Sequence, residues 1–173
     1  MAVKQIKSYL SKLNISWNLN QLPATAYLVG GSVRDALLQR YKTPFDLDFV
    51  LPDKTIETAK EIANKYDAGF VVLDREREIA RVVFPEGTLD FARQEGASLA
   101  TDLKRRDFTI NAIAFNSKSG QLVDPLGGVA DLKRKTLRMV SANNLEDDPL
   151  RLLRAYRQAA QLDFTVEEKT QQA

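Results

Sequence analysis

Short apolar runs alternate with polar turns along most of this chain. Apolar residues recur at helical spacing over residues 1–14, 32–40 and 56–66, which predicts helices there. Strand-like runs cover residues 26–29, 45–51, 70–73, 79–84 and 88–91. Residues 108–115 are apolar enough for either a buried helix or a buried strand, and from Leu150 onward the spacing is helical only.

This order of elements predicts an α/β (α+β) fold in which a small mixed β-sheet is flanked by helices and followed by a helical segment. We expect a first domain over residues 1–140, with an N-terminal helix within residues 1–20, and the start of an all-helical domain over residues 141–173. Because the sequence stops inside a helical pattern, we expect either a fragment or a helical body beyond residue 173.

The 173 residues include no cysteine and no histidine. This excludes thiol nucleophiles, zinc fingers and Ser-His-Asp triads. A metal site would need oxygen ligands, which favours magnesium or manganese. The net charge of +2 is too small to indicate nucleic acid by itself. We expect no signal peptide, no membrane association and a cytoplasmic location.

Gly30, Gly31, Ser32 and Arg34 lie where a predicted strand passes into a helix. Paired glycines let a phosphate approach the backbone, and the start of a helix attracts an anion. Arg34 would add a charge-assisted contact to that phosphate. The alternative is a tight turn capped by Ser32; this is not a Walker A loop, since no Gly-Lys-Ser/Thr follows.

Three aspartates on two predicted strands form the second candidate site. Asp46 and Asp48 alternate with Phe45, Leu47 and Phe49, so the two carboxylates share one strand face. If the strand containing Asp90 lies beside them, the three carboxylates suit two-metal phosphoryl transfer. The alternative is a solvated acidic strand face, with Asp90 facing water on an edge strand.

Two further polar runs could contact a nucleotide. Arg106 and Asp107 precede an apolar stretch, and an α-helix beginning at Asp107 would place Asn111 on the same face, where the pair could hydrogen-bond a ribose. The alternative is an Asp N-cap with solvated arginines. Further along, a basic stripe lies opposite Leu152, Leu153, Tyr156 and Ala160; it consists of Arg151, Arg154 and Arg157. Asp148 precedes Pro149 and is also the expected N-cap of this helix.

Taken together, these runs resemble the class II tRNA nucleotidyltransferase and bacterial poly(A) polymerase family. The matching segments occur in the family's order over most of the chain and are residues 28–35, 46–48, 105–112, 124–128 and 147–164. The resemblance implies a nucleotidyltransferase head, a helical neck that templates the incoming base, and body and tail domains that hold tRNA. This chain would cover the head and the beginning of the neck.

The resemblance also implies roles for individual residues. Asp46 and Asp48 would bind Mg²⁺, with Asp90 as a third carboxylate. The triphosphate and sugar would be held by Gly30, Gly31, Ser32, Arg34, Arg106, Asp107 and Asn111. In the motif formed by Asp147, Asp148 and Arg151, a carboxylate would accept the exocyclic amine of C or A, and an arginine would donate to a ring acceptor. The basic stripe would continue this nucleotide site.

The implied reaction adds C, or C and A, from CTP and ATP to the 3′ end of tRNA. Residues 92–104 are shorter than the flexible basic loop of CCA-adding members, which in this family is associated with adding C but failing to add the terminal A. We therefore hypothesise a CC-adding specialist. The rivals are a poly(A) polymerase acting on RNA 3′ ends, a catalytically inactive nucleotide-binding module, and a structural RNA-binding domain.

Overall fold

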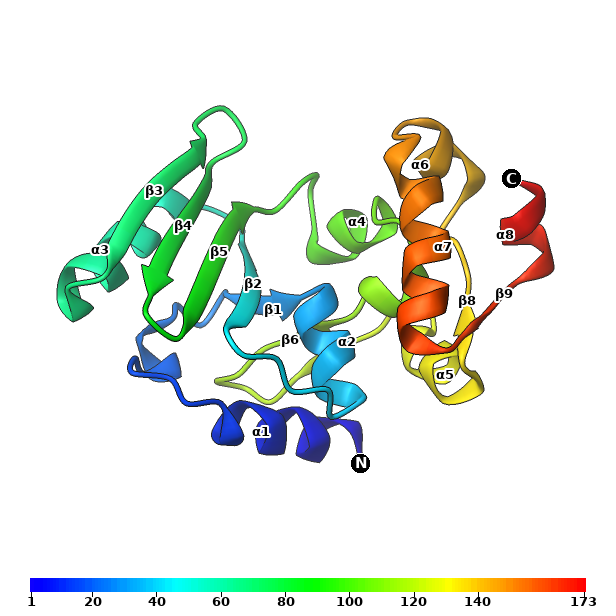
Figure 1. Ribbon diagram of the computed structural model, residues 1–173. Helices are drawn as coiled ribbons and strands as arrows, with labels where there is room; N and C mark the ends of the chain where they lie inside the picture. Colours follow the sequence, from blue (N-terminus) through cyan, green and yellow to red (C-terminus); the bar gives the residue numbers. More distant parts are fainter.

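A mixed seven-stranded sheet forms the centre of the computed structural model, which describes residues 1–173 (Figure 1). Its strand order is β3-β4-β5-β2-β1-β6-β7. Strands β2 and β5 are parallel, and the other neighbouring pairs are antiparallel. The strands are β1 (Tyr27–Val29), β2 (Phe45–Leu51), β3 (Gly69–Asp74), β4 (Ile79–Phe84), β5 (Gly87–Arg93), β6 (Ala114–Phe115) and β7 (Leu122–Val123). The predicted fold class, a small mixed sheet flanked by helices, is confirmed.

Helices surround this sheet and continue beyond it. They are α1 (Ala2–Lys12), α2 (Gly31–Leu37), α3 (Thr55–Tyr66), α4 (Leu99–Lys104), α5 (Gly128–Arg134), α6 (Ala142–Glu146), α7 (Leu150–Leu162) and α8 (Glu168–Gln172), with 3₁₀ turns η1 (Leu19–Gln21) and η2 (Thr109–Asn111). None of the helices combines the length and the apolar character needed to cross a membrane.

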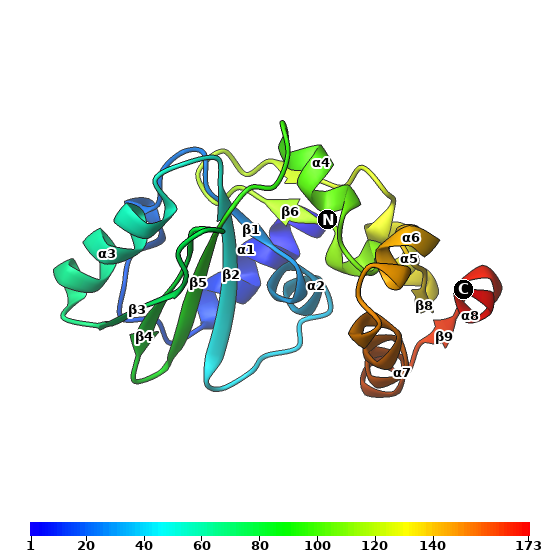
Figure 2. The same ribbon diagram turned by 90° about the horizontal axis from the view of Figure 1, so that it is seen from above.

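The alternation along β2 gives the sheet one buried face and one open face. Phe45, Leu47 and Phe49 are at most 4% exposed, and the ring of Phe49 stacks on that of Phe91 from β5 at 5.4 Å. Helix α3 packs against β3, β4 and β5. The polar residues of β2 lie on the other face. In both views α7 lies on the opposite side of β2 from α3 (Figures 1 and 2). This open face holds the candidate site.

A short strand interrupts the helices that were expected from Leu150 onward. Strand β9 (Thr165–Val166) pairs in parallel with β8 (Thr136–Leu137). Asp163 ends α7 in the left-handed conformation, with φ of 57°, and the β-branched pair that follows extends along β8. The chain after α7 is therefore attached to the segment before α6.

Two other segments differ from their predicted form. Strand β5 continues through Arg93, and Ser98 caps α4 by accepting the Thr101 amide at 3.2 Å, so only residues 94–98 form a loop where we expected one over residues 92–104. The buried run over residues 108–115 is neither one helix nor one strand, but the turn η2 followed by β6.

Helix α7 exposes the apolar residues that lie opposite its basic stripe. Leu153 is 67% exposed and Tyr156 is 74% exposed. The helix packs instead through Ala155, Gln158 and Leu162, and its arginines line the gap toward the sheet.

Candidate active site

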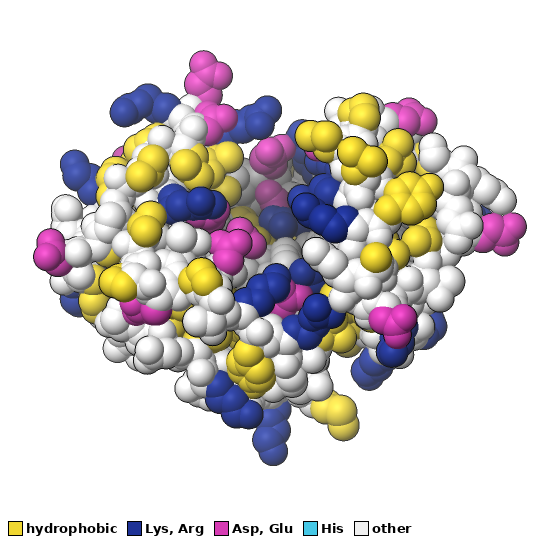
Figure 3. Space-filling model, viewed as in Figure 1, with side chains coloured by type: hydrophobic (Ala, Val, Ile, Leu, Met, Phe, Trp, Pro, Cys, Tyr) yellow, Lys and Arg dark blue, Asp and Glu magenta, His cyan; other side chains and the backbone are white.

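A charged cleft of about 620 Å³ lies between the open face of the sheet and α7. Of its 21 lining residues only four are hydrophobic. Figure 3 shows Lys, Arg, Asp and Glu side chains meeting in this hollow. A cleft with this lining suits a highly charged, hydrophilic ligand.

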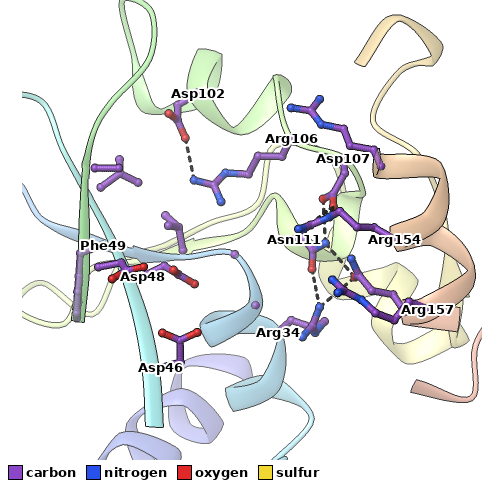
Figure 4. Close-up of a pocket in the computed structure, with 18 of the residues that line it drawn as sticks. Arg34, Asp46, Asp48, Phe49, Asp102, Arg106, Asp107, Asn111, Arg154 and Arg157 are labelled. Atoms are coloured by element: carbon purple, nitrogen blue, oxygen red, sulfur yellow. Dashed lines mark hydrogen bonds and ion pairs between the residues drawn. The ribbon is translucent and has the colours of Figure 1, made fainter. Parts of the chain in front are cut away.

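Three carboxylates converge at the sheet side of the cleft. One oxygen each from Asp46, Asp48 and Asp90 can be chosen so that all three lie within 4.8 Å of one another. The parallel register of β2 and β5 causes this, because it pairs Asp48 with Asp90 and Asp46 with Thr88. The Thr88 hydroxyl donates to Asp46 at 2.8 Å. The structure therefore brings together the three aspartates singled out from the sequence (Figure 4 labels the first two).

Burial and the nearby negative charges raise the pKa of Asp48. Burial, together with the charges of Asp46 and Asp90, raises this pKa to about 6. A hydrogen bond from Ser32 and the charge of Arg106 act in the opposite direction. Carboxylates held this close repel one another, so a cation between them would relieve the repulsion.

Ser32 lies behind the carboxylates rather than on the surface of the cleft. Its hydroxyl is 3.2 Å from Oδ2 of Asp48 and accepts the Asp48 amide at 3.0 Å. Its 4% exposure leaves little access for a phosphate. The Ser32 hydroxyl thus fixes Asp48, and a contact of Ser32 with a phosphate stays a prediction.

Arg81 of β4 was not singled out from the sequence, yet it is directly bonded to the acidic cluster. Its Nε and Nη2 atoms donate to the two oxygens of Asp90 at 2.6 and 2.7 Å. Arg81 and Asp90 are register partners across β4 and β5, which places their side chains on the same face. The short connection between β4 and β5 was a usable signal for this pair, because a tight hairpin sets Arg81 opposite Asp90.

The donor set of the acidic cluster suits a hard divalent cation. All three side chains offer carboxylate oxygens, and the cluster contains no nitrogen or sulfur ligand. Magnesium and manganese prefer oxygen ligands of this kind. Asp46, Asp48 and Asp90 are therefore the residues that could hold such an ion.

The bend at Gly30 forms the floor of the cleft beside Asp48. Gly30 has φ of 68°, and a Cβ atom there would lie 3.1 Å from Nη1 of Arg106 and 3.8 Å from Oδ2 of Asp48. The arginine side chain therefore passes directly over the glycine. The Nη2 atom of Arg106 donates to Asp102 at 3.1 Å, while its Nε is buried without a partner. The sequence arguments did not identify Asp102.

A buried hydrogen-bond network joins the sheet side of the cleft to α7. Nη1 of Arg34 donates to Asn111 at 2.9 Å and to Gln158 at 3.0 Å, and its Nε contacts Asp35 at 2.9 Å. The side-chain amide of Asn111 donates to Oδ1 of Asp107 at 2.9 Å. Arg34 is thus engaged on several sides within the protein. Gln158, which follows Arg154 by one helical turn, was missed although its position on the arginine face of α7 was a usable signal.

We expected an α-helix to begin at Asp107, and none does. The side chains of Asp107 and Asn111 nevertheless contact each other. The 3₁₀ turn η2 brings them together, and the second carboxylate oxygen of Asp107 accepts from Nε of Arg154 at 2.8 Å and forms an ion pair with its Nη2, also at 2.8 Å. Figure 4 shows this arrangement beside Arg157.

The start of α7 supplies the remaining charged groups of the cleft. The N-cap of α7 is Pro149, one residue after the expected Asp148. Asp148 accepts the Leu150 amide at 3.0 Å, and its other oxygen lies 3.6 Å from Nε of Arg151. Nη1 of Arg151 also donates to the carbonyl of Asn144 at 2.7 Å. The cleft is lined here by Asp148, Arg151, Arg154 and Arg157. Asp148 therefore both accepts an amide at the start of α7 and lines the cleft.

Comparison with known proteins agrees with this geometry. The family profile described as the poly(A) polymerase head domain matches residues 26–138. The chain is 60% identical over 165 residues to a CC-adding tRNA nucleotidyltransferase of Synechocystis sp., covering 94% of this chain and 40% of that protein. It is 46% identical over 155 residues to an A-adding tRNA nucleotidyltransferase of Deinococcus radiodurans, covering 90% of this chain and 35% of that protein.

Solved structures show the same similarity. The CCA-adding enzyme of Thermotoga maritima complexed with tRNA-CCA superposes with a TM-score of 0.82 at 32% identity, covering 96% of this chain and 43% of that one. The chain spans about two-fifths of the length of these relatives. With the family profile matching well over half of its residues, the chain belongs to the class II tRNA nucleotidyltransferase and poly(A) polymerase family.

Proposed function

We propose that this chain is the catalytic head of an enzyme that transfers a nucleoside monophosphate from CTP to the 3′ hydroxyl of tRNA and releases pyrophosphate. The observation that carries the proposal is the convergence of Asp46, Asp48 and Asp90 in one cleft with the arginines of α7. The CC-adding and A-adding relatives, and the similarity to an enzyme solved with tRNA, support the choice of primer.

The carboxylates would hold Mg²⁺ through Asp46 and Asp48, with Asp90 as a third ligand. When bound, the metal supplies activation of the attacking hydroxyl and charge stabilisation of the triphosphate. Ser32 fixes Asp48 from behind, and Thr88 fixes Asp46. These contacts limit rotation of both ligands, so the residues are oriented before substrate enters.

The nucleotide would lie between the Gly30 bend and α7. Gly30 and Gly31 leave room for phosphates, and Arg106 and Arg154 face the same cleft with their positive charges. Asp107 and Asn111 would contact the sugar. Arg34, held by Asn111 and Gln158, would support the floor of this site as well as add charge.

The base would be selected by Asp148 and Arg151 at the start of α7, with Arg157 extending the basic wall. A carboxylate can accept the exocyclic amine of C or A, while an arginine donates to a ring acceptor. Uracil presents a carbonyl where the amine is needed, which leaves the carboxylate unpaired. This arrangement would replace a nucleic-acid template.

The short connection after β5 favours a CC-adding enzyme over a CCA-adding one. Residues 94–98 alone form this loop, because β5 and α4 occupy its flanks. The 60% identity to a CC-adding relative supports the same choice. Addition of labelled ATP to a tRNA ending in CC by the full-length protein would refute it, while addition of two C residues and no A is the expected result.

We place the head at residues 1–140 and the beginning of the neck at residues 141–173, and we propose that the enzyme acts in the cytoplasm. A primer-extension assay of the full-length protein with CTP and ATP supplied separately tests the activity. We expect incorporation of C into tRNA lacking its CCA end. Efficient addition of long A tails to unstructured RNA would instead support the poly(A) polymerase alternative, and binding of CTP without any incorporation would support the inactive module.

A further inference from the structure

Asp102 is a buried carboxylate that no part of the proposed reaction yet uses. It lies in α4 and is 9% exposed. A buried carboxylate costs stability unless it is paired and hydrogen-bonded. Its two oxygens have different partners, and those partners belong to different segments of the chain.

One oxygen of Asp102 binds the loop after β5. Its Oδ1 accepts the backbone N–H of Glu95 at 2.9 Å. This bond fixes one end of the five-residue loop over residues 94–98 against α4. The contact uses the backbone of Glu95, so it is independent of the exposed ion pair between that side chain and Arg105.

The other oxygen of Asp102 binds the arginine that covers the Gly30 bend. Its Oδ2 accepts from Nη2 of Arg106 at 3.1 Å (Figure 4). The same guanidinium places Nη1 over Gly30. Nε of this arginine is buried and has no acceptor within the protein. No other side chain accepts a hydrogen bond from the guanidinium, so Asp102 is its one hydrogen-bonded anchor.

We propose that Asp102 is a positioning residue that holds Arg106 in place for the phosphates of the incoming nucleotide and connects it to the loop after β5. The inference rests on the proposed function, in which Arg106 faces the triphosphate. An arginine held by a carboxylate loses less rotamer freedom when a phosphate binds. Asp102 itself does not need to touch the nucleotide.

The test is a double-mutant cycle of Asp102→Asn and Arg106→Gln in the full-length protein. The readout is the dissociation constant for CTP, measured calorimetrically with magnesium and without primer. Asparagine can still accept the Glu95 amide, so the substitution removes mainly the charged contact to Arg106. Since hydrogen bonds to charged groups are among the strong ones, we expect Asp102→Asn alone to weaken CTP binding by about tenfold.

The decisive comparison is the double variant. We expect Asp102→Asn to have almost no further effect once Arg106 is Gln, because the positioned group is gone. Equal weakening in both backgrounds would overturn the proposal, since it would show a general structural role, and so would unchanged binding in the single variant. Glu95→Gln, which breaks the exposed pair with Arg105 but keeps the backbone contact, is the matched control and should bind CTP normally.

Thermal unfolding of each variant verifies folding. If Asp102→Asn does not fold, Asp102→Glu takes its place, and its longer side chain is expected to displace the guanidinium and weaken CTP binding only while Arg106 is present. The binding readout is separate from catalysis. A protein that binds CTP as expected but adds nothing to tRNA would contradict the proposed function and leave the pairing of Asp102 with Arg106 intact.

Discussion

Arg81 and Asp90 face each other across β4 and β5, and the arginine donates to both carboxylate oxygens, at 2.6 and 2.7 Å. The guanidinium of Arg81 places a positive charge next to the acidic cluster, in which one carboxylate oxygen from each of the three aspartates lies within 4.8 Å of the other two. It therefore offsets part of the repulsion that the acidic cluster has when no cation is bound.

Replacing Arg81 by Gln should make the protein depend more strongly on a divalent ion. We expect the metal-free variant to unfold at a lower temperature than the wild type, by an amount that reflects a partly exposed ion pair worth about 0.5–1 kcal/mol. Magnesium should then raise the melting temperature more in the variant than in the wild type. Differential scanning calorimetry with and without magnesium measures this.

Arg93→Gln is the matched control for this experiment. It removes another arginine–carboxylate pair of the same sheet, with Glu78 at 3.2 Å, which does not include the acidic cluster. Its response to magnesium should equal that of the wild type. An equal response of all three proteins would show that Arg81 does not balance the charge of the cluster.

Asp46→Asn should abolish nucleotide addition while leaving the fold intact. The carboxylate is exposed, and an asparagine oxygen can still accept the Thr88 hydroxyl. The loss should be large, about a thousandfold or more, because electrostatic stabilisation of the transition state is lost. The measurement is kcat for C addition alongside circular dichroism. Asp53→Asn, an exposed change just after β2, should behave as the wild type, and turnover retained by the Asp46 variant would remove this residue from the metal site.

The raised pKa of Asp48 predicts how stability depends on pH in the absence of metal. Burial and its acidic neighbours raise this pKa from 3.8 to about 6. The folded state therefore holds the proton more tightly than the unfolded state, so the contribution of this group is most favourable below pH 4 and is lost as the pH rises toward 6. At neutral pH the loss is on the order of 2 to 3 kcal/mol.

Asp48→Asn removes this titration. In EDTA at pH 7.5 we expect the variant to have a higher free energy of unfolding than the wild type, and near pH 4 the difference should disappear. Urea unfolding across this pH range measures the effect. Parallel curves at all pH values would contradict the assigned cause, whereas saturating magnesium should reverse the order of the two proteins at pH 7.5.

Arg151→Ala should weaken discrimination between bases. The side chain lies 3.6 Å from Asp148 and lines the cleft, where it is proposed to donate to a ring acceptor of C. Uracil lacks that acceptor, so removal of the donor should lower the preference for CTP over UTP by about tenfold or more. The ratio of kcat/KM for the two nucleotides tests this, with Lys104→Ala at the end of α4 as control. A ratio that does not change would exclude Arg151 from base selection.

The strand that carries Asp46 and Asp48 was predictable because alternation with Phe45, Leu47 and Phe49 determines which face is buried. The convergence with Asp90 could be predicted only on the condition that its strand lies beside the strand of Asp46 and Asp48. Two-residue periodicity says which face a side chain takes but not which strand lies next to it. The tight connection between β4 and β5 could pair Arg81 with Asp90, but it does not show that this pair lies beside Asp46 and Asp48.

The other misses have local physical causes. The turn η2 brings Asp107 and Asn111 together at a spacing that also fits an α-helix, so the two residues do lie side by side although the predicted element was wrong. Strand β9 is only two residues long, too short for a periodic pattern. Asp102 was hidden because its importance depends on its partners, Glu95 and Arg106, and not on the residues beside it in sequence.

In the proposed function, Asp46 and Asp48 jointly hold a divalent ion beside the nucleotide phosphates. The most direct test is a crystal structure of the protein with CTP and Mn²⁺, recorded with anomalous diffraction. We expect an anomalous peak within coordination distance of both carboxylates and of a phosphate oxygen of CTP, with Arg106 on the triphosphate. Manganese bound elsewhere, or CTP bound with no ion at these two aspartates, would contradict it.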